Sequence, residues 1–380
     1  MAKVTPEVLA TTYDITGAPT PSGSDKNHQA VAEFQGQTMK EKDLEEFFRK
    51  YVKDAKAGDD KVAKFVGDKN KNEPEAEASL DIQYIMGNNA GLKTEFWLFN
   101  PMDFCGDLEK WTALILETKE APLVHSVSYG WQGELAQIQC SEAKYKVVDA
   151  NFAKLAAMGI TIIFASGDSG SGYDPTSSSE CEESKFKKGK AFNGTVLKEV
   201  KFQYDAGECC DSAGTHKGAK GWTFKKKDKG RKPGECTLYH EITHTTDEPG
   251  AQSAHLTGAK LYPSWPASSP WVTSVGATRF VGQKVGNEQM ASDQFGSGGG
   301  FSTMFNRSLA SWQESVVTTY LADAPGLPPK GSFPPGGRAT PDVSALGEGY
   351  MTIIGGTAQP IGGAMVHSVI LTDQAGILPT

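Results

Sequence analysis

Residues 143–170 read AKYKVVDANFAKLAAMGITIIFASGDSG, and this stretch decides the fold class. Ala143–Met158 predicts a helix that stops at Gly159. Ile160–Ala165 then forms an apolar run with the length of a buried strand, and Ser166–Asp168 follows it as a turn. A helix that leads directly into a buried strand is typical of a parallel sheet with helices on its faces.

The flanking sequence repeats this alternation. Ala121–Tyr129 reads as a strand, while Glu41–Asp54 carries the apolar stripe of an amphipathic helix. A further helix is predicted over Glu75–Met86, ending near Gly87. Because ligands of parallel sheets gather at the carboxyl ends of the strands, the turns that follow the two predicted strands are candidate site segments.

Composition excludes several classes of protein. The chain has 380 residues, 38% hydrophobic and 22% charged, which suits one large domain or two smaller ones. A net charge of −8 argues against a general nucleic-acid binder, since phosphate attraction needs excess cation. No apolar run approaches the roughly 20 residues that span a bilayer. The first residues also lack the apolar core of a secretory signal, so the sequence itself predicts a soluble, untargeted chain.

The cysteines favour a different compartment. Four of the six fall within one segment, and the even count allows a disulfide framework and therefore an oxidising environment. Asn193 and Asn306 begin glycosylation sequons, although such short patterns often arise by chance. Free thiols in a cytosolic protein are the alternative. We favour a lysosomal or secreted parent protein whose leader is not part of this sequence.

The segment from Thr176 to Thr257 differs from its surroundings. It has four cysteines, few apolar runs and a basic cluster at Lys225–Lys232. We interpret it as a Cys-rich loop inserted into the domain. The basic cluster suits a solvated loop better than a localisation or polyanion-binding signal.

Glu77 and Asp81 lie four residues apart on a predicted helix, so their side chains share one face. If both are buried, they share a proton and one pKa rises. Such a pair can act as a general base in acid, where an isolated histidine is protonated. The alternative is a solvated acidic face, since Glu73 and Glu75 lie nearby.

Asp168 is a third candidate carboxyl, in a glycine-flanked turn directly after a buried strand. When protonated, it can donate a hydrogen bond to a developing oxyanion. A simple turn-capping role is the alternative.

Seven blocks together resemble the sedolisin family of serine-carboxyl peptidases, most closely its tripeptidyl-peptidase branch. They occur in the family's order over nearly the whole chain outside the inserted loop. The blocks are Val4–Pro6, Glu77–Tyr84, His125–Gly130, Phe164–Gly170, Trp265–Thr278, Ser297–Ser302 and Arg338–Ala345. The resemblance implies a subtilisin-like fold, in which helices sandwich a parallel sheet. It would make residues 1–380 a single peptidase domain, truncated at its C-terminal end, with the 176–257 loop inserted in it.

The resemblance also implies roles. Glu77 matches the general base, Asp81 the carboxyl that orients it, and Asp168 the oxyanion-stabilising acid. The predicted walls that bind the peptide backbone are Ser128, Tyr129, Gly130, Ser297, Gly298, Gly299 and Gly300. The family's reaction is acid hydrolysis of peptide bonds through a serine acyl-enzyme. The expected partners are peptides or unfolded proteins, with no nucleic acid and no membrane, and the expected state is a monomer.

One departure from the family pattern bears directly on activity. The family's nucleophile lies in a Gly-Thr-Ser-Ala-Ser-x-Pro block, but residues 359–373 contain only its flanks. Ser368 lies more than a helical turn too far along, and Gly355–Ala358 has alanine at the serine position. Without a nucleophile, only residual catalysis by binding and oxyanion stabilisation remains.

Two further family features are missing. The calcium site lies beyond the nucleophile, in a stretch that this chain does not reach, so no cofactor is expected here. The prodomain is also absent. An incomplete gene model explains all three losses together, and a non-catalytic, peptide-binding pseudo-peptidase is the alternative.

Two rival motifs are weaker. His240–His244 fits the zinc-protease pattern His-Glu-x-x-His, but this pattern requires a helix, and the segment is rich in β-branched residues. Gly167–Gly170 resembles the nucleophile loop of trypsin-like proteases, but the upstream histidines lack the required context and the α/β pattern is wrong for a double barrel.

Overall fold

The structure is a computed structural model that describes residues 2–15, 27–172, 181, 183–216, 218–226, 232–256, 261–292, 295–324, 327–328 and 332–363. The chain divides into two compact units. The larger comprises Met1–Gly172, Tyr262–Asp323 and Pro335–Thr380, and the smaller comprises Tyr173–Leu261 and Ala324–Pro334.

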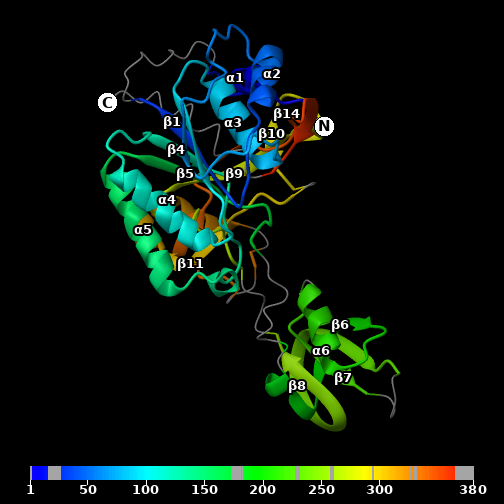
Figure 1. Cartoon of the computed structure of the whole chain (residues 1–380). Helices are drawn as coiled ribbons and strands as arrows, with labels where there is room; N and C mark the ends of the chain where they lie inside the picture. The colour runs from blue at the N-terminus through cyan, green and yellow to red at the C-terminus, as the bar shows by residue number, and fades with distance from the viewer. Residues whose placement is uncertain are drawn as a thin grey trace. The chain divides into compact units, whose positions relative to one another are not determined.

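A mostly parallel sheet forms the centre of the larger unit (Figure 1). Its strand order is β10 (Glu288–Met290), β9 (Thr273–Phe280), β5 (Thr161–Ala165), β4 (Val124–Val127), β1 (Gln29–Phe34), β3 (Thr94–Phe99) and β2 (Lys64–Gly67). β13 (Val343–Leu346) also pairs with β9 in parallel, and among the described strands of this sheet only β10 runs antiparallel to its neighbour. The predicted parallel α/β fold is confirmed.

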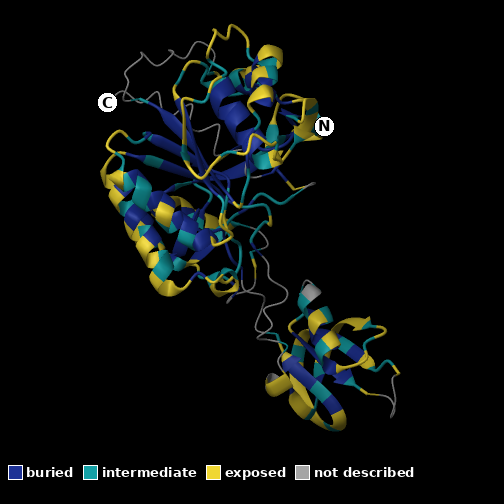
Figure 2. Ribbon diagram, in the orientation of Figure 1, coloured by how far each residue is buried: buried dark blue, intermediate teal, exposed yellow. Residues whose placement is uncertain are grey.

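Helices cover both faces of this sheet. On one face, α1 (Pro6–Thr12), α2 (Glu41–Tyr51) and α3 (Ala76–Asn88) enclose a core that includes Val31, Phe96 and Leu98 of the strands. On the other, α4 (Phe104–Glu117) and α5 (Glu142–Ala157) pack on Ala30, Ala32, Phe34 and Trp97. Figure 2 shows the strands buried between exposed outer helix faces.

The alternation of side chains along β1 has a consequence for function. Successive residues of a strand point to opposite faces of the sheet. Val31 lies in the core beneath α2 and α3, whereas Ala32 and Phe34 lie in the core beneath α4 and α5. Glu33 therefore shares the face of Val31, which places a carboxyl on the α3 side of the sheet.

The predicted elements agree with the structure to within a few residues. The helices predicted over 41–54, 75–86 and 143–158 correspond to α2, α3 and α5. The strands predicted over 121–129 and 160–165 correspond to β4 and β5. The largest difference is in β4, which is shorter than the predicted strand. Residues 128–130 leave the sheet at its carboxyl end.

Smaller elements complete the larger unit. They are η1 (Leu135–Ile138), η3 (Val281–Gln283), β11 (Gly300–Asn306), η4 (Arg307–Gln313), α7 (Glu314–Asp323), β12 (Gly337–Thr340), β14 (Tyr350–Ile354) and β15 (Thr357–Ile361). The β14–β15 hairpin fixes α3 from outside the sheet. The Gln83 amide donates to the Ile353 carbonyl at 2.7 Å and accepts from its N–H at 2.9 Å, and the Tyr84 hydroxyl donates to the Val4 carbonyl at 2.8 Å.

The smaller unit has a sheet and a core of its own. β8 (Glu235–His255) lies between β6 (Lys187–Val200) and β7 (Gly221–Lys225), with η2 (Glu183–Lys185) and α6 (Ala206–Thr215) completing the unit. Its core contains Trp222, Phe224 and Leu238. The sequence predicted a loop here, whereas the structure has a three-stranded sheet. The strands were not recognised because they are largely polar and exposed and lack the apolar runs of the main sheet. Both predicted boundaries, 176 and 257, lie outside the described residues, as do 227–231 of the basic cluster.

Three disulfides join all six cysteines. Cys105–Cys140 connects α4 to the segment before α5, while Cys181–Cys210 and Cys209–Cys236 lie in the smaller unit. Disulfides of this number are typical of proteins that fold in an oxidising compartment. Among the described residues, no helix combines the length and apolar character needed to cross a bilayer.

The disulfides are expected to hold the smaller unit together. Its core is small, and Cys209 and Cys236 are themselves 0% and 2% exposed within it. Replacing both with serine should destabilise the unit by about 2–5 kcal/mol. Hydrogen exchange measured by mass spectrometry should then rise in peptides from 187–255 and stay unchanged in peptides from β1, β4 and β5. Unaltered exchange in the smaller unit would contradict this assignment.

Candidate active site

Four carboxyl side chains from separate parts of the chain meet at one edge of the main sheet. Glu77 and Asp81 come from α3, Glu33 from β1, and Asp168 from the turn after β5. The negative charges of the other three all act on Glu77, which places the group within mutual electrostatic range. We call Glu33, Glu77, Asp81 and Asp168 the carboxyl cluster.

The fold explains this meeting point. β1, β4 and β5 are adjacent and parallel, so their carboxyl ends share one edge. Glu33 lies near the end of β1, Ser128 follows β4, and Asp168 follows β5. On α3, the spacing of four residues turns Glu77 and Asp81 to the same side.

Burial differs among these carboxyls. Asp81 and Glu33 are both 0% exposed, whereas Glu77 and Asp168 are half-buried. This burial does not fit the alternative of a solvated acidic face. Oε1 of Glu77 is itself buried and has no hydrogen-bond partner among the described residues. Glu77 therefore has a free acceptor oxygen within the site.

Two hydroxyl groups contact the cluster. The Ser128 hydroxyl donates to Oδ2 of Asp81 at 2.5 Å. The Tyr129 hydroxyl lies 3.0 Å from Oε2 of Glu33 and 3.2 Å from the carbonyl oxygen of Phe34. Both hydroxyls come from the segment that follows β4.

The environment strongly favours protonated carboxyls. Burial raises the pKa of Asp81 to about 8, and the hydrogen bond from Ser128 offsets part of that rise. Burial also raises the pKa of Glu77, followed by the charges of Asp81, Glu33 and Asp168. The pKa of Glu33 is raised by burial and then by the charge of Asp81, with the Tyr129 hydroxyl opposing. Glu33, Glu77 and Asp81 therefore retain protons at pH values where ordinary carboxyls are ionised.

The Asp168 turn lies against the predicted glycine-rich wall. The N–H of Gly298 donates to the Gly167 carbonyl at 2.6 Å, and the Ser166 hydroxyl donates to the Gly298 carbonyl at 2.8 Å. A Cβ atom on Gly298 would lie 1.9 Å from the Ser166 carbonyl oxygen, so only glycine permits this approach. Backbone contacts thus join Asp168 and the 297–300 segment into one structure.

The other predicted substrate-binding residues have varied surroundings. Gly130 is exposed, whereas the Ser297 hydroxyl accepts a hydrogen bond from the Ala277 N–H at 2.7 Å. The side chains of Ser128 and Tyr129 both contact the carboxyl cluster. Binding of peptide backbone by Ser128–Gly130 and by Ser297, Gly298, Gly299 and Gly300 stays a prediction.

Sequence reasoning missed Glu33. A signal was present, because Gln29–Phe34 reads QAVAEF, an apolar strand with one acidic residue near its end. A carboxyl in an otherwise buried strand needs a special environment. Only the neighbourhood of β1 and β4 in the sheet, however, reveals which carboxyls it joins.

The rival motifs lie in other settings. His240 and His244 are on β8, an extended strand, so they lack the helix that the zinc-protease pattern requires. In the described part of the chain, no three His, Cys, Asp or Glu side chains are arranged so that they could hold a metal ion. Ser368 and the rest of 364–380 are outside the described residues.

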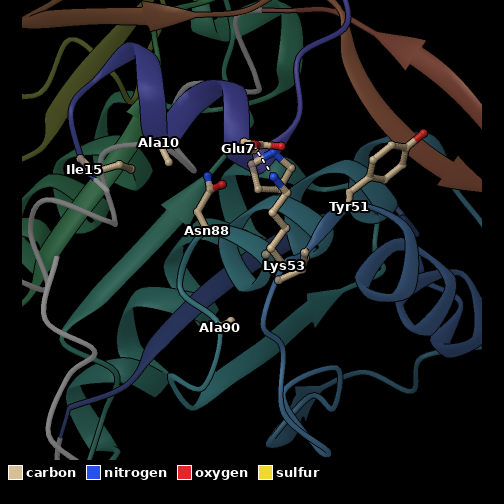
Figure 3. Close-up of a pocket in the computed structure, with 10 residues that line it drawn as sticks. Glu7, Ala10, Ile15, Tyr51, Lys53, Asn88 and Ala90 are labelled. Carbon is tan, nitrogen blue, oxygen red and sulfur yellow. Dashed lines mark hydrogen bonds and ion pairs between the residues drawn. The ribbon is translucent and has the colours of Figure 1, made fainter. Parts of the chain in front are cut away.

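A cavity of about 290 Å³ lies elsewhere in the larger unit and contains none of the predicted site residues (Figure 3). Residues of α1, the end of α2 and the end of α3 line it, and two of the lining side chains, Glu7 and Lys53, form an ion pair. Its chemistry is unrelated to the carboxyl cluster, so we place the candidate site at the cluster.

Known proteins agree with this architecture. Pseudomonas sedolisin, a serine-carboxyl proteinase solved with two molecules of pseudo-iodotyrostatin, matches with a TM-score of 0.58 and 19% identity, covering 99% of this chain and 80% of that one. At this identity the likeness shows the fold alone, and it confirms the predicted subtilisin-like class. No family model matches the chain.

Sequence comparison gives a nearer relationship. Tripeptidyl-peptidase 1 of Bos taurus and that of Homo sapiens are each 30% identical over 353 residues, which are 92% of this chain and 47% of theirs. The chain thus spans about half the length of the curated relatives it matches. These matches relate the chain to the sedolisin family, on its tripeptidyl-peptidase branch, and confirm the resemblance predicted from the motifs.

Proposed function

We propose that the parent protein is an acid serine-carboxyl peptidase of the tripeptidyl-peptidase type, which hydrolyses peptides or unfolded proteins. The observation that carries this proposal is the buried carboxyl cluster, in which Glu77 retains a free acceptor oxygen. A serine hydroxyl that donated to this oxygen would be activated for attack on a peptide carbonyl.

In this proposal the carboxyls divide the chemistry. Glu77 accepts the proton of the nucleophile, and Asp81 orients the Glu77 carboxyl. A protonated Asp168 donates a hydrogen bond to the oxyanion. The raised pKa of Glu77 makes its ionised form a stronger base than an ordinary carboxylate. The proposal assigns no cofactor to this chain and takes the monomer as its working state.

The chain as it stands is a poor catalyst under the same proposal. The sequence around Gly363 has the flanks of the family's nucleophile block without its serines. A non-catalytic, peptide-binding pseudo-peptidase is therefore the second candidate, and the unpartnered Oε1 of Glu77 supports it equally well.

A lysosomal or secreted location of the parent protein belongs to the proposal as well. Three disulfides support an oxidising route of folding. The raised pKa values of buried carboxyls support an acidic site of action, because protonated carboxyls are the form that burial favours.

Peptide hydrolysis at about pH 4 tests both candidates. We expect turnover reduced by about 10⁶-fold relative to an enzyme that has its nucleophile, because removing one member of such a catalytic unit removes nearly all of its effect. Binding of an unlabelled peptide should be measured in parallel by calorimetry. Binding without turnover favours the pseudo-peptidase for this chain.

A matched pair of variants gives the control. Glu77→Gln keeps the size of the side chain at the site, whereas Glu73→Gln makes the same change at an exposed position four residues earlier. Robust turnover that Glu77→Gln abolishes and Glu73→Gln preserves would show an active peptidase and overturn the expected inactivity. Absence of both binding and turnover would contradict both candidates.

A further inference from the structure

One sequence motif of the larger unit has no part in the proposed chemistry. Asn306, Arg307 and Ser308 form a glycosylation sequon where β11 ends and η4 begins. An Asn-x-Ser sequence often arises by chance, so the sequence alone does not distinguish a used site from an unused one. The folded chain adds the surroundings of the three side chains.

The first and third residues of this sequon lie at the surface. Asn306 and Ser308 are both exposed. Leu309 and Trp312, which follow in η4, are 51% and 61% exposed, so the surface next to the sequon is open to solvent. A glycan is bulky and hydrophilic, and it needs open space of this kind.

The middle residue fixes the sequon to the rest of the larger unit. The N–H of Arg307 donates to the Gly336 carbonyl at 2.8 Å. Its guanidinium donates to the Pro335 carbonyl at 2.5 Å and to the Glu314 carboxylate at 2.8 Å, and the side chain is only 13% exposed. The Arg307 side chain is thus held against the protein, while its two neighbours remain at the surface.

The amide of Asn306 has its nitrogen free. Oδ1 accepts a hydrogen bond from the Ser308 N–H at 2.8 Å. Within the described part of the chain, no hydrogen bond uses Nδ2, the atom to which a glycan attaches. Attachment of a sugar at Nδ2 would therefore break no hydrogen bond between described residues.

The other sequon has different surroundings. Asn193 is half-buried on β6, and its Nδ2 donates to the Thr246 hydroxyl at 3.0 Å. The next residue, Gly194, lies so close to β8 that a Cβ atom on it would be 1.9 Å from the Glu241 carbonyl oxygen. The nitrogen of Asn193 is thus engaged within a paired strand, so the structure favours Asn306 over Asn193.

We propose that Asn306 is an acceptor site for an N-linked oligosaccharide. The donor is an oligosaccharide carried on a lipid diphosphate, the form in which a secretory pathway supplies it. Transfer joins Nδ2 to the anomeric carbon of the first sugar and breaks the bond from that carbon to the phosphate oxygen. The lipid diphosphate leaves, and Nδ2 gives up one proton. This proposal rests on the secretory route of the proposed function and not on its catalytic chemistry.

Mass spectrometry of the full 380-residue chain tests the site. An added leader directs the chain into the secretory pathway of eukaryotic cells, and a glycan-releasing amidase is then applied in water labelled with ¹⁸O. The amidase converts a glycosylated asparagine into a labelled aspartate. We expect this label at position 306. Ser308→Ala, which removes the hydroxyl of the sequon, should abolish the label, whereas Ser308→Thr should retain it.

Asn193→Gln is the matched control, because it removes the other sequon and leaves Asn306 in place. It should leave the label at position 306 unchanged, whereas Asn306→Gln should make the chain lose one glycan on a denaturing gel. Since the oligosaccharide is transferred as the chain is synthesised, chain retained inside the cells is analysed too. A variant that fails to fold therefore still reports whether the site was used.

Two results would overturn the proposal. In the first, the unmodified chain passes through the secretory pathway and its Asn306 stays unlabelled. In the second, the label at position 306 persists in Ser308→Ala. A labelled Asn306 in a chain that neither hydrolyses nor binds peptides would instead contradict only the proposed function.

Discussion

The folded protein is expected to be more stable at pH 4 than at pH 7, because the carboxyl cluster resists ionisation. The pKa of Asp81 is raised from 3.8 to about 8 in the folded state. Its stabilising contribution is complete below the unfolded value, is lost as pH rises between the two values, and is exhausted above about 8. This range corresponds to on the order of 5 kcal/mol for Asp81 alone. Glu33 and Glu77, whose pKa values are also raised, act in the same direction.

One buried base opposes this trend. Burial, and then the nearby charge of His28, lowers the pKa of His125 from 6.5 to about 3. The contribution of His125 is therefore complete above pH 6.5 and is lost as pH falls towards 3. Since three carboxyls act against one imidazole over the same range, we expect net stabilisation in acid.

Thermal unfolding between pH 4 and pH 7 measures this balance. Asp81→Asn and Glu33→Gln remove one titrating group each and should flatten the dependence on pH. Glu73→Gln, at an exposed position with no role in the cluster, should leave it unchanged. A melting temperature that rises steadily from pH 4 to pH 7 would contradict the assignment of raised pKa values.

Arg338→Ala should destabilise the larger unit by about 3–5 kcal/mol, the cost of removing one partner from a buried ion pair. Arg338 is 0% exposed and donates to Oδ2 of Asp342 at 2.6 Å. It also donates to the carbonyls of Ala339 at 2.8 Å and Val272 at 3.2 Å. The alanine variant removes this charged donor from all three acceptors, although Asp342 and the Ala339 carbonyl keep hydrogen bonds from the Gln313 amide.

Denaturation in urea gives the free energy of unfolding for this comparison. Arg49→Ala is the matched control, since its ion pair with Glu46 lies on the surface, with the arginine side chain 74% exposed. Its loss should cost less than about 1 kcal/mol. Equal effects of the two variants would show that Arg338 contributes no more than a surface charge.

Much of the main fold could be predicted from hydrophobic periodicity. α2, α3, α5 and β5 have strong patterns and clear ends, such as Gly159 after α5. These signals depend only on neighbouring residues, which is why sequence alone suffices for them. The strand order of the sheet carries no such local signal.

The site was predictable only in part for the same reason. Glu77 and Asp81 are neighbours on one helix, so their spacing indicates a shared face. Glu33 and Ser128 join them through the pairing of β1 with β4, a relation between segments nearly 100 residues apart. The smaller unit was harder still, since its strands are polar on much of their length and two disulfides lie against its core.

The points where the chain leaves and rejoins the larger unit have a consequence for protein engineering. The N–H of Tyr262 donates to the Gly172 carbonyl at 3.2 Å, so the two ends of the long excursion are already in contact. Evolution or a designer can thus replace residues 173–261 by another module. The second segment of the smaller unit, residues 324–334, would have to be shortened at the same time.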